Sequence, residues 1–294
     1  MSRYFARPAV TTWDPQQYLR FADERTRPFR ELLARVPALP PAPVVLDIGC
    51  GPGNSTEVLR ERWPDATLVG IDSSPEMLAA AAGVAGAEYR LADAATWDPA
   101  GERPDLIASN ATLQWLGFSA AGQAAEGPSS PKAGKEGRAP GHLAVLTRWA
   151  AALRPGGVLA FQVPGNFDAP SHRLLADLRR SPRWREALGQ DAVRAGVHRP
   201  EEYLDVLLGA GCATADVWET TYSTLLTGDD PVLEWVRGTA LRPVLALLPD
   251  PAERAAFEAE YAALLRDAYP AGPHGTVFPF RRVFAVAVRT GAPR

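Results

Sequence analysis

Short apolar runs alternate with segments of helical periodicity through the first half of this chain. Short segments, most of them largely apolar as is typical of buried strands, predict strands at about 44–48, 67–71, 88–91, 105–109 and 158–163. Between them, apolar residues at helix-like spacing predict helices at about 54–62, 75–82 and 142–153. This alternation predicts βαβ units, and therefore a parallel sheet with helices on both faces.

The flanking segments follow different patterns. Residues 15–36 are predicted to be helical, and a run with four prolines at 37–43 ends that helix. Residues 117–141 are rich in Gly, Ala, Ser and Pro without hydrophobic periodicity, which predicts a solvated inserted loop. Two further helical stretches, about 170–210 and 229–270, each precede a strand candidate, at 214–225 and 282–288.

The most informative segment is the connection that follows the first apolar run. Gly49, Gly51 and Gly53 alternate there, which allows a sharp turn and leaves the backbone bare for a ligand. Asn54, Ser55 and Thr56 come next and are residue types that cap helices, so we expect free amide donors at the loop. The segment predicts a pocket for a nucleotide-like cofactor.

Polar residues also follow the next three strands. Asp72 lies 19 positions after Gly53, where a carboxylate can bind both hydroxyls of a ribose. Asp93 closes the third strand, and Asn110 the fourth, shortly before Trp115. The glycine spacing is Gly-x-Gly-x-Gly rather than Gly-x-Gly-x-x-Gly, which disfavours a nicotinamide-dependent oxidoreductase, as does the lack of a Tyr-x-x-x-Lys pair.

These four strand ends, in this order, resemble the class I S-adenosylmethionine-dependent methyltransferases. Several further segments are similar to the trans-aconitate methyltransferase family, and the resemblance covers roughly residues 13 to 289 with one gap. The segments are Tyr18–Pro28, Ile71–Met77, Asn110–Trp115, Gln162–Phe167, Gly211–Cys212, Val217–Tyr222 and Phe278–Phe284.

The resemblance implies an α/β fold: a Rossmann-like, seven-stranded, mostly parallel sheet with an antiparallel closing strand and a helical cap formed by inserts. It implies one methyltransferase domain over residues 1–294. Its parts would be an N-terminal helical segment (13–43), a cofactor-binding core (44–163) containing the loop 117–141, cap inserts (164–213 and 229–280) and a closing strand (282–289).

The resemblance also assigns roles around S-adenosylmethionine. The glycine loop would underlie its amino-acid and ribose parts, Asp72 would accept the ribose hydroxyls, Ser73 and Met77 would flank the adenine, and Asp93 would accept its amino group. The implied cofactor-binding residues are Asp47, Gly49, Gly51, Gly53, Asn54, Asp72, Ser73, Met77, Asp93, Ala94 and Asn110.

The implied reaction is esterification of one carboxylate of trans-aconitate. A carboxylate is ionised near neutral pH, since its unperturbed pKa is roughly 4, so no general base is required. We therefore expect no catalytic acid or base, with alignment by Asn110 and Trp115. The acceptor's charges call for arginines and polar neighbours, and the candidates are Arg25, Arg27, Gln162, Asn166, His172, Tyr222, Arg242, Arg281 and Arg282.

Two alternatives stay open. A methyltransferase of the same fold could act on another small acid or a natural-product metabolite, and a neutral acceptor would then require a base. A non-catalytic protein would bind the cofactor without turnover.

Composition narrows the partners. A net charge of −3 over 294 residues argues against a nucleic-acid surface. Of 31 basic residues only Lys132 and Lys135 are lysines, so an anion site here must be built from arginine. The two cysteines form no metal or disulfide pattern, and neither a leader-like nor a membrane-spanning apolar run is apparent, so we expect a cytoplasmic protein without a metal. The sequence leaves the oligomeric state open, with a monomer as the default.

Overall fold

A computed structural model describes residues 22–116, 141–188 and 197–291. The chain divides into two compact units. Among the described residues, the sheet unit comprises 22–116, 141–167, 197–222 and 280–291, and the helical unit comprises 168–188 and 223–279. The loop expected at 117–141 lies, except for Gly141, outside the described residues.

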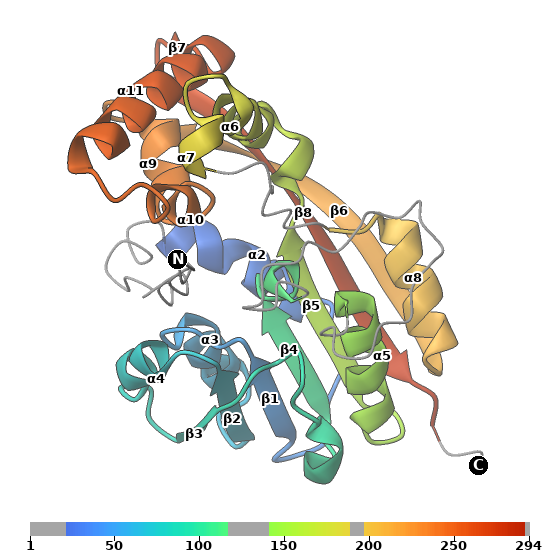
Figure 1. The fold of residues 1–294 in the computed structure, drawn as a ribbon. Coiled ribbons are helices and arrows are strands. Elements are labelled where there is room, and N and C mark those ends of the chain that lie inside the picture. Colours follow the sequence, from blue (N-terminus) through green and yellow to red (C-terminus); the bar gives the residue numbers. More distant parts are fainter. Residues whose placement is uncertain (1–21, 117–140, 189–196, 292–294) are drawn as a thin grey trace, which may run out of the picture. The chain divides into compact units, whose positions relative to one another are not determined.

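The described residues form one mixed sheet with the strand order β3-β2-β1-β4-β5-β8-β6, and β7 pairs with β8 (Figure 1). Strands β1 to β5 are parallel neighbours, and β8 runs antiparallel to β5. The mostly parallel sheet with an antiparallel closing strand is therefore confirmed. The strands are β1 (Val44–Ile48), β2 (Thr67–Asp72), β3 (Ala87–Leu91), β4 (Leu106–Asn110), β5 (Val158–Pro164), β6 (Cys212–Leu226), β7 (Ala271–Gly272) and β8 (Gly275–Arg289).

Five α-helices of the sheet unit are described. Three of them, α3, α4 and α5, lie within one residue of the bounds that their periodicity predicted. The helices are α2 (Ala22–Ala34), α3 (Asn54–Arg62), α4 (Pro75–Ala81), α5 (His142–Ala152) and α8 (Pro200–Gly209). Short 3₁₀ turns occur at η1 (Pro99–Glu102) and η2 (Leu113–Trp115), and a third, η3 (Asn166–Asp168), follows β5.

Alternate residues of the strands enter two separate cores, as the period of two in a strand requires. Leu46, Ile107 and Phe161 belong to the core that also contains Trp149 of α5 and Tyr203 of α8. The other core takes the intervening strand positions, Val45, Leu106, Ala108, Val158, Ala160 and Phe284, together with apolar residues of α2 and α3. Helices therefore cover both faces of the sheet.

The helical unit contains the two predicted helical stretches apart from α8, which belongs to the sheet unit. Its core uses aromatic edges: the rings of Trp184 and Phe257 lie 5.2 Å apart, and those of Tyr269 and Phe278 also 5.2 Å. No described helix is long and apolar enough to cross a membrane. The helices are α6 (Pro170–Arg180), α7 (Arg185–Leu188), α9 (Pro231–Arg237), α10 (Arg242–Leu245) and α11 (Pro251–Ala268).

Candidate functional site

The glycine loop leaves the carboxyl end of β1 and is anchored on β2. The amides of Gly49 and Cys50 both donate to the carbonyl of Ile71, at 2.7 and 3.0 Å. β1 pairs with β2 on one side and β4 on the other, so the loops that follow β1 and β4 start from neighbouring strands. In open parallel sheets, ligands bind at this position beyond the carboxyl ends of the strands.

Two glycines of the loop differ in what surrounds them. A Cβ at Gly49 would lie 2.0 Å from Oγ1 of Thr112, and φ of +75° is itself unfavourable for other residues. A Cβ at Gly51 would meet nothing within 4 Å. Gly49 is therefore required by the fold, whereas Gly51 leaves open space above the loop. Gly53, with φ of 97°, precedes α3.

The expected capping of α3 by its first side chains is wrong. Gly53 is the N-cap and makes no side-chain cap bond, while Asn54 is the first helical residue. The hydroxyls of Ser55 and Thr56 instead donate to Oδ2 of Asp47, at 2.8 and 2.6 Å. They turn toward the sheet because a buried carboxylate without hydrogen-bond donors costs more free energy than a helix end without a side-chain cap.

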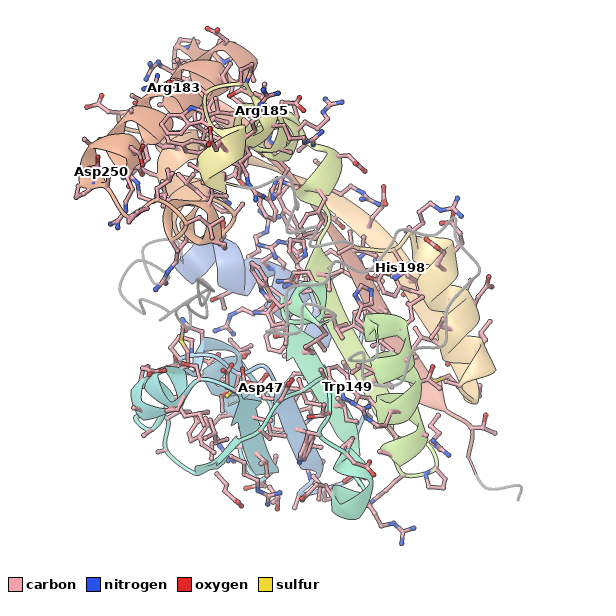
Figure 2. The ribbon with its side chains drawn as sticks, viewed as in Figure 1. Asp47, Trp149, Arg183, Arg185, His198 and Asp250 are labelled. Atoms are coloured by element: carbon pink, nitrogen blue, oxygen red, sulfur yellow. The ribbon has the colours of Figure 1, made fainter. Side chains whose placement is uncertain are left out.

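Asp47 is fully buried on β1, and Figure 2 marks its place there. Its Oδ1 atom has no hydrogen-bond partner among the described residues. Burial raises its pKa to about 6, an effect that the hydroxyls of Thr56 and Ser55 partly offset. A buried acceptor oxygen beside the glycine loop suits a cationic or hydrogen-bond-donating ligand group.

Asp72 joins the end of β2 to the glycine loop. Its Oδ2 accepts from the amide of Gly51 at 3.0 Å, and its Oδ1 from the amide of Ser74 at 2.9 Å. Each carboxylate oxygen can accept a second bond, so Asp72 keeps acceptor capacity for a ligand. Ser73 is exposed, whereas Met77 is 5% exposed and packed.

The loop after β3 is held in place by hydrogen bonds from a side chain of α5. Asp93 is exposed and its Oδ1 accepts from the amide of Ala95 at 2.8 Å, while Ala94 is buried. Nη2 of Arg148 donates to the carbonyls of Ala95 and Ala94, at 2.7 and 3.3 Å. The sequence carries no signal for Arg148, because its partners lie more than 50 residues away.

Three polar side chains form a relay across β4, β5 and β8, which we call the amide relay: Asn110, Gln162 and Arg282. Nη1 of Arg282 donates to Oε1 of Gln162 at 3.0 Å, and Nε2 of Gln162 donates to Oδ1 of Asn110. Gln162 is 1% and Arg282 5% exposed. The sequence placed all three at the site but did not predict that they bind one another.

A second polar group lies on α2 and β6. Glu31 accepts from Nε of Arg27 at 2.8 Å and from the hydroxyl of Tyr222. Burial and the hydrogen bond to Glu31 raise the pKa of Tyr222. The guanidinium carbon of Arg27 lies 5.1 Å from the centroid of the Tyr222 ring. Arg25 belongs to the same helix, but its side chain is outside the described ones.

Arg281 also has a partner that sequence reasoning missed. Its Nε donates to Oε2 of Glu219 at 3.0 Å, and its Nη1 to the carbonyl of Gly165 at 3.1 Å. The amide of Arg281 donates to Oδ1 of Asn166 at 2.5 Å, which fixes the turn after β5. The Arg281–Glu219 pair is the kind of long-range contact that no local motif predicts.

The remaining candidates lie in different places. Trp115 is half-buried on η2. His172, on α6 of the helical unit, has its pKa lowered to about 4 by burial, and Arg242 begins α10 in the same unit. That they join the sheet-unit residues in one substrate site stays a prediction. Among the described residues, no three His, Cys, Asp or Glu side chains cluster as metal ligands would.

The fold agrees with that of two solved structures. Over 96% of this chain and 93% of the other, a putative sarcosine dimethylglycine methyltransferase from Galdieria sulphuraria matches at a TM-score of 0.50 and 14% identity. The YcgJ protein of Bacillus subtilis matches at 0.51 and 14% identity, over 90% of this chain and 100% of that one. At these identities the likeness concerns the fold alone, which is that of the class I methyltransferases.

Sequence comparison narrows the family. Residues 18–205 match a family described as a methyltransferase domain. A trans-aconitate 2-methyltransferase of Streptomyces avermitilis is 54% identical, covering 95% of this chain and 97% of the relative. One from Rhodococcus jostii is 48% identical, over 94% and 98%. The chain belongs to the trans-aconitate 2-methyltransferase family.

Proposed function

We propose that this protein transfers a methyl group from S-adenosylmethionine to a carboxylate of trans-aconitate, giving the methyl ester and S-adenosylhomocysteine. The observation that carries the proposal is the glycine loop, tied to Asp72 through the Gly51 amide and open above Gly51. It occurs in a chain that is 54% identical to a trans-aconitate 2-methyltransferase over nearly its whole length.

The residues at the loop suit this cofactor. S-adenosylmethionine is a cation with an amino-acid end, a ribose and an adenine. The buried Oδ1 of Asp47 offers an acceptor that the described residues leave unused, and Asp72 retains capacity for two hydroxyls. Asp93 and the amide of Ala94 would meet the adenine edge, with Ser73 and Met77 beside the ring. Gly49, Gly53 and Asn54 would complete the loop.

When bound, the cofactor supplies a methyl group on a sulfonium; the new C–O bond forms as the C–S bond breaks, and the electron pair stays on sulfur. No proton moves, because the acceptor carboxylate is already ionised. The chain's residues therefore bind, align and exclude water, and none is needed as a general base. Asn110, at the end of β4, and Trp115, on the following turn η2, are the residues we propose for alignment.

The acceptor would be bound by arginines and amides. The candidates are Arg25, Arg27, Gln162, Asn166, His172, Tyr222, Arg242, Arg281 and Arg282. Arg27 and Arg281 already pair with Glu31 and Glu219, and a guanidinium with five donors can bind a second carboxylate beside the first. A small diffusible acid requires no nucleic acid or membrane, and we propose a monomer that works in the cytoplasm.

The test is incubation with methyl-labelled S-adenosylmethionine and a panel of di- and tricarboxylates, with mass analysis of the esters. We expect trans-aconitate to give a labelled monoester faster than cis-aconitate, citrate or isocitrate. Preferential turnover of a different acid would show that the acceptor is not trans-aconitate, while the protein would still be a carboxylate methyltransferase. Cofactor binding without turnover of any acid would identify a binding protein instead.

A further inference from the structure

We propose that Arg282 and Gln162 are positioning residues that fix the side-chain amide of Asn110 with its N–H donors toward the acceptor carboxylate. Asn110 then serves the anion that receives the methyl group rather than the sulfonium that supplies it. The inference rests on the proposed function, since it assumes an anionic acceptor at this edge of the sheet.

The direction of the relay follows from its first member. A guanidinium has only donors, so Gln162 must turn its Oε1 toward Arg282, and their atoms lie 3.0 Å apart. The other end of the same amide is then the Nε2 group, which can only donate. It reaches Asn110, which must accept through Oδ1. Asn110 is left with its Nδ2 donors, which bond to no described residue.

The three residues of the amide relay lie on one face of the sheet. Asn110 and Gln162 are register partners on β4 and β5, and Arg282 lies on β8 opposite Pro164. All three positions alternate with the residues of the α5 core, so they share the face covered by α2. The backbone carbonyl of Gln162 accepts from the amide of Ala111 at 2.9 Å, and the Arg282 guanidinium carbon lies 4.8 Å from the Phe280 ring centroid.

Reversal of the Gln162 amide would place its NH₂ group against a guanidinium in a nearly dry environment. That arrangement loses a charge-assisted hydrogen bond and brings donors together, which is strongly unfavourable. The orientation of Asn110 is therefore determined by a residue more than 100 positions away. Half-buried at the carboxyl end of β4, Asn110 offers N–H groups, which attract an anion and do not attract a sulfonium.

Gln162→Glu tests the donor–acceptor direction of the amide relay without removing the hydrogen bond to Arg282. The new carboxylate keeps the bond with Arg282, so the variant should fold, but it turns an acceptor toward Asn110. Asn110 must then rotate to donate, and its Oδ1 faces the acceptor site. Loss of a hydrogen bond to a charged group corresponds to about ten- to hundredfold in affinity. We expect KM for trans-aconitate to rise by about that factor, while the calorimetric Kd of S-adenosylmethionine changes by less than about threefold.

A double-mutant cycle separates this rotation from simple repulsion by the added charge. In an Asn110→Ala background no amide remains to rotate, so Gln162→Glu should add less than about twofold to KM. An equal effect in both backgrounds would show that the carboxylate acts directly and would overturn the proposal. In a second pair, Arg282→Met should raise KM several-fold, and Arg282→Lys, which still only donates, should restore most of that loss.

NMR of the side-chain amides gives a readout independent of turnover. In Gln162→Glu the NH₂ protons of Asn110 should shift downfield and exchange more slowly, because they donate to a carboxylate. Unchanged resonances would contradict the relay even if the wild type methylates trans-aconitate. If instead the wild type uses another acid, the proposed acceptor fails, and the same cycle is measured with that acid.

Discussion

The edge of the sheet formed by the carboxyl ends of its parallel strands has two parts that are held together differently. We call them the backbone half (the glycine loop and the ends of β2 and β3) and the side-chain half (β4, β5 and β8). At the ends of β2 and β3, acidic side chains hold backbone amides: Asp72 binds the amides of Gly51 and Ser74, and Asp93 that of Ala95. At β4, β5 and β8, side chains hold side chains, as in the Arg282–Gln162–Asn110 relay. We expect the backbone half to suit a cofactor of fixed shape, and the side-chain half to let single substitutions change which acceptor is bound.

The largest effect should come from Asp72, where the backbone half depends on one carboxylate. Asp72→Ala removes the acceptors for two loop amides and for the ribose, so we expect S-adenosylmethionine affinity to fall at least about a hundredfold by calorimetry. Asp72→Asn, which keeps one acceptor oxygen, should lose less. The Asn110 amide resonances should not change in either variant; a change would show that the two halves are not separable.

Two glycine substitutions distinguish a glycine that the fold needs from a glycine that ligand binding needs. Gly49→Ala forces a Cβ against Thr112 at φ of +75° and should reduce the free energy of unfolding by about 3 kcal/mol in urea titrations. Gly51→Ala meets no atom and should lose only about 1 kcal/mol, yet weaken cofactor binding more than tenfold. Thr112→Gly should recover part of the Gly49→Ala loss. Similar losses of stability in both alanine variants would contradict the conclusion that the fold requires Gly49 but not Gly51.

The backbone half was largely predictable from the sequence because its signals are local. The sequence predicted the first five strands within one residue, and the glycines and Asp72 lie within 24 residues of one another. The sequence also identified Asn110, Gln162 and Arg282 as candidates, through family resemblance. It could not show that they bind one another, because contacts between residues 52 and 120 positions apart depend on strand order and side-chain rotation.

The capping error arises over a much shorter separation in sequence. Ser55 and Thr56 follow a glycine loop and would cap α3 by local rules, yet both donate to Asp47 on β1. A helix end can be solvated or capped by backbone, but a fully buried carboxylate has no such alternative. Tertiary packing therefore overrode local preference at Ser55 and Thr56. The contacts of Glu219 and Arg148 were missed for another reason, because their partners lie 62 and 53 positions away.

Asp47 should make the backbone half sensitive to pH. Its pKa of about 6 when folded, against about 3.8 otherwise, means that the folded protein holds its proton more tightly. Stability from this group is therefore lost as pH rises from about 4 to about 6, by about 3 kcal/mol. His142 and His172, with pKa values lowered to about 4 by burial, have the opposite slope, since stability falls as pH decreases below about 6.5.

Both proteins contain the same histidines, so the difference between the free energies of unfolding of the wild type and Asp47→Asn isolates the contribution of Asp47. Urea titrations between pH 4 and 8 should show the wild type losing stability relative to the variant up to about pH 6, with no further change above it. The variant should also bind S-adenosylmethionine about tenfold less tightly, because the neutral amide offers a cation less. A difference that is independent of pH would show that Asp47 is not protonated in this range.

The smallest effect is expected at Arg148, which tests whether the two halves are independent. Arg148 holds the carbonyls of Ala94 and Ala95 and has no contact with the relay among the described side-chain bonds. Arg148→Met should weaken S-adenosylhomocysteine binding by about three- to tenfold by loosening the loop after β3, and leave KM for the acceptor unchanged. Arg154→Met is the matched control, because Arg154 pairs with Asp105, which precedes β4, and should not affect cofactor binding. A rise in acceptor KM in Arg148→Met would mean that the loop after β3 also shapes the acceptor side, and the separation into a backbone half and a side-chain half would fail.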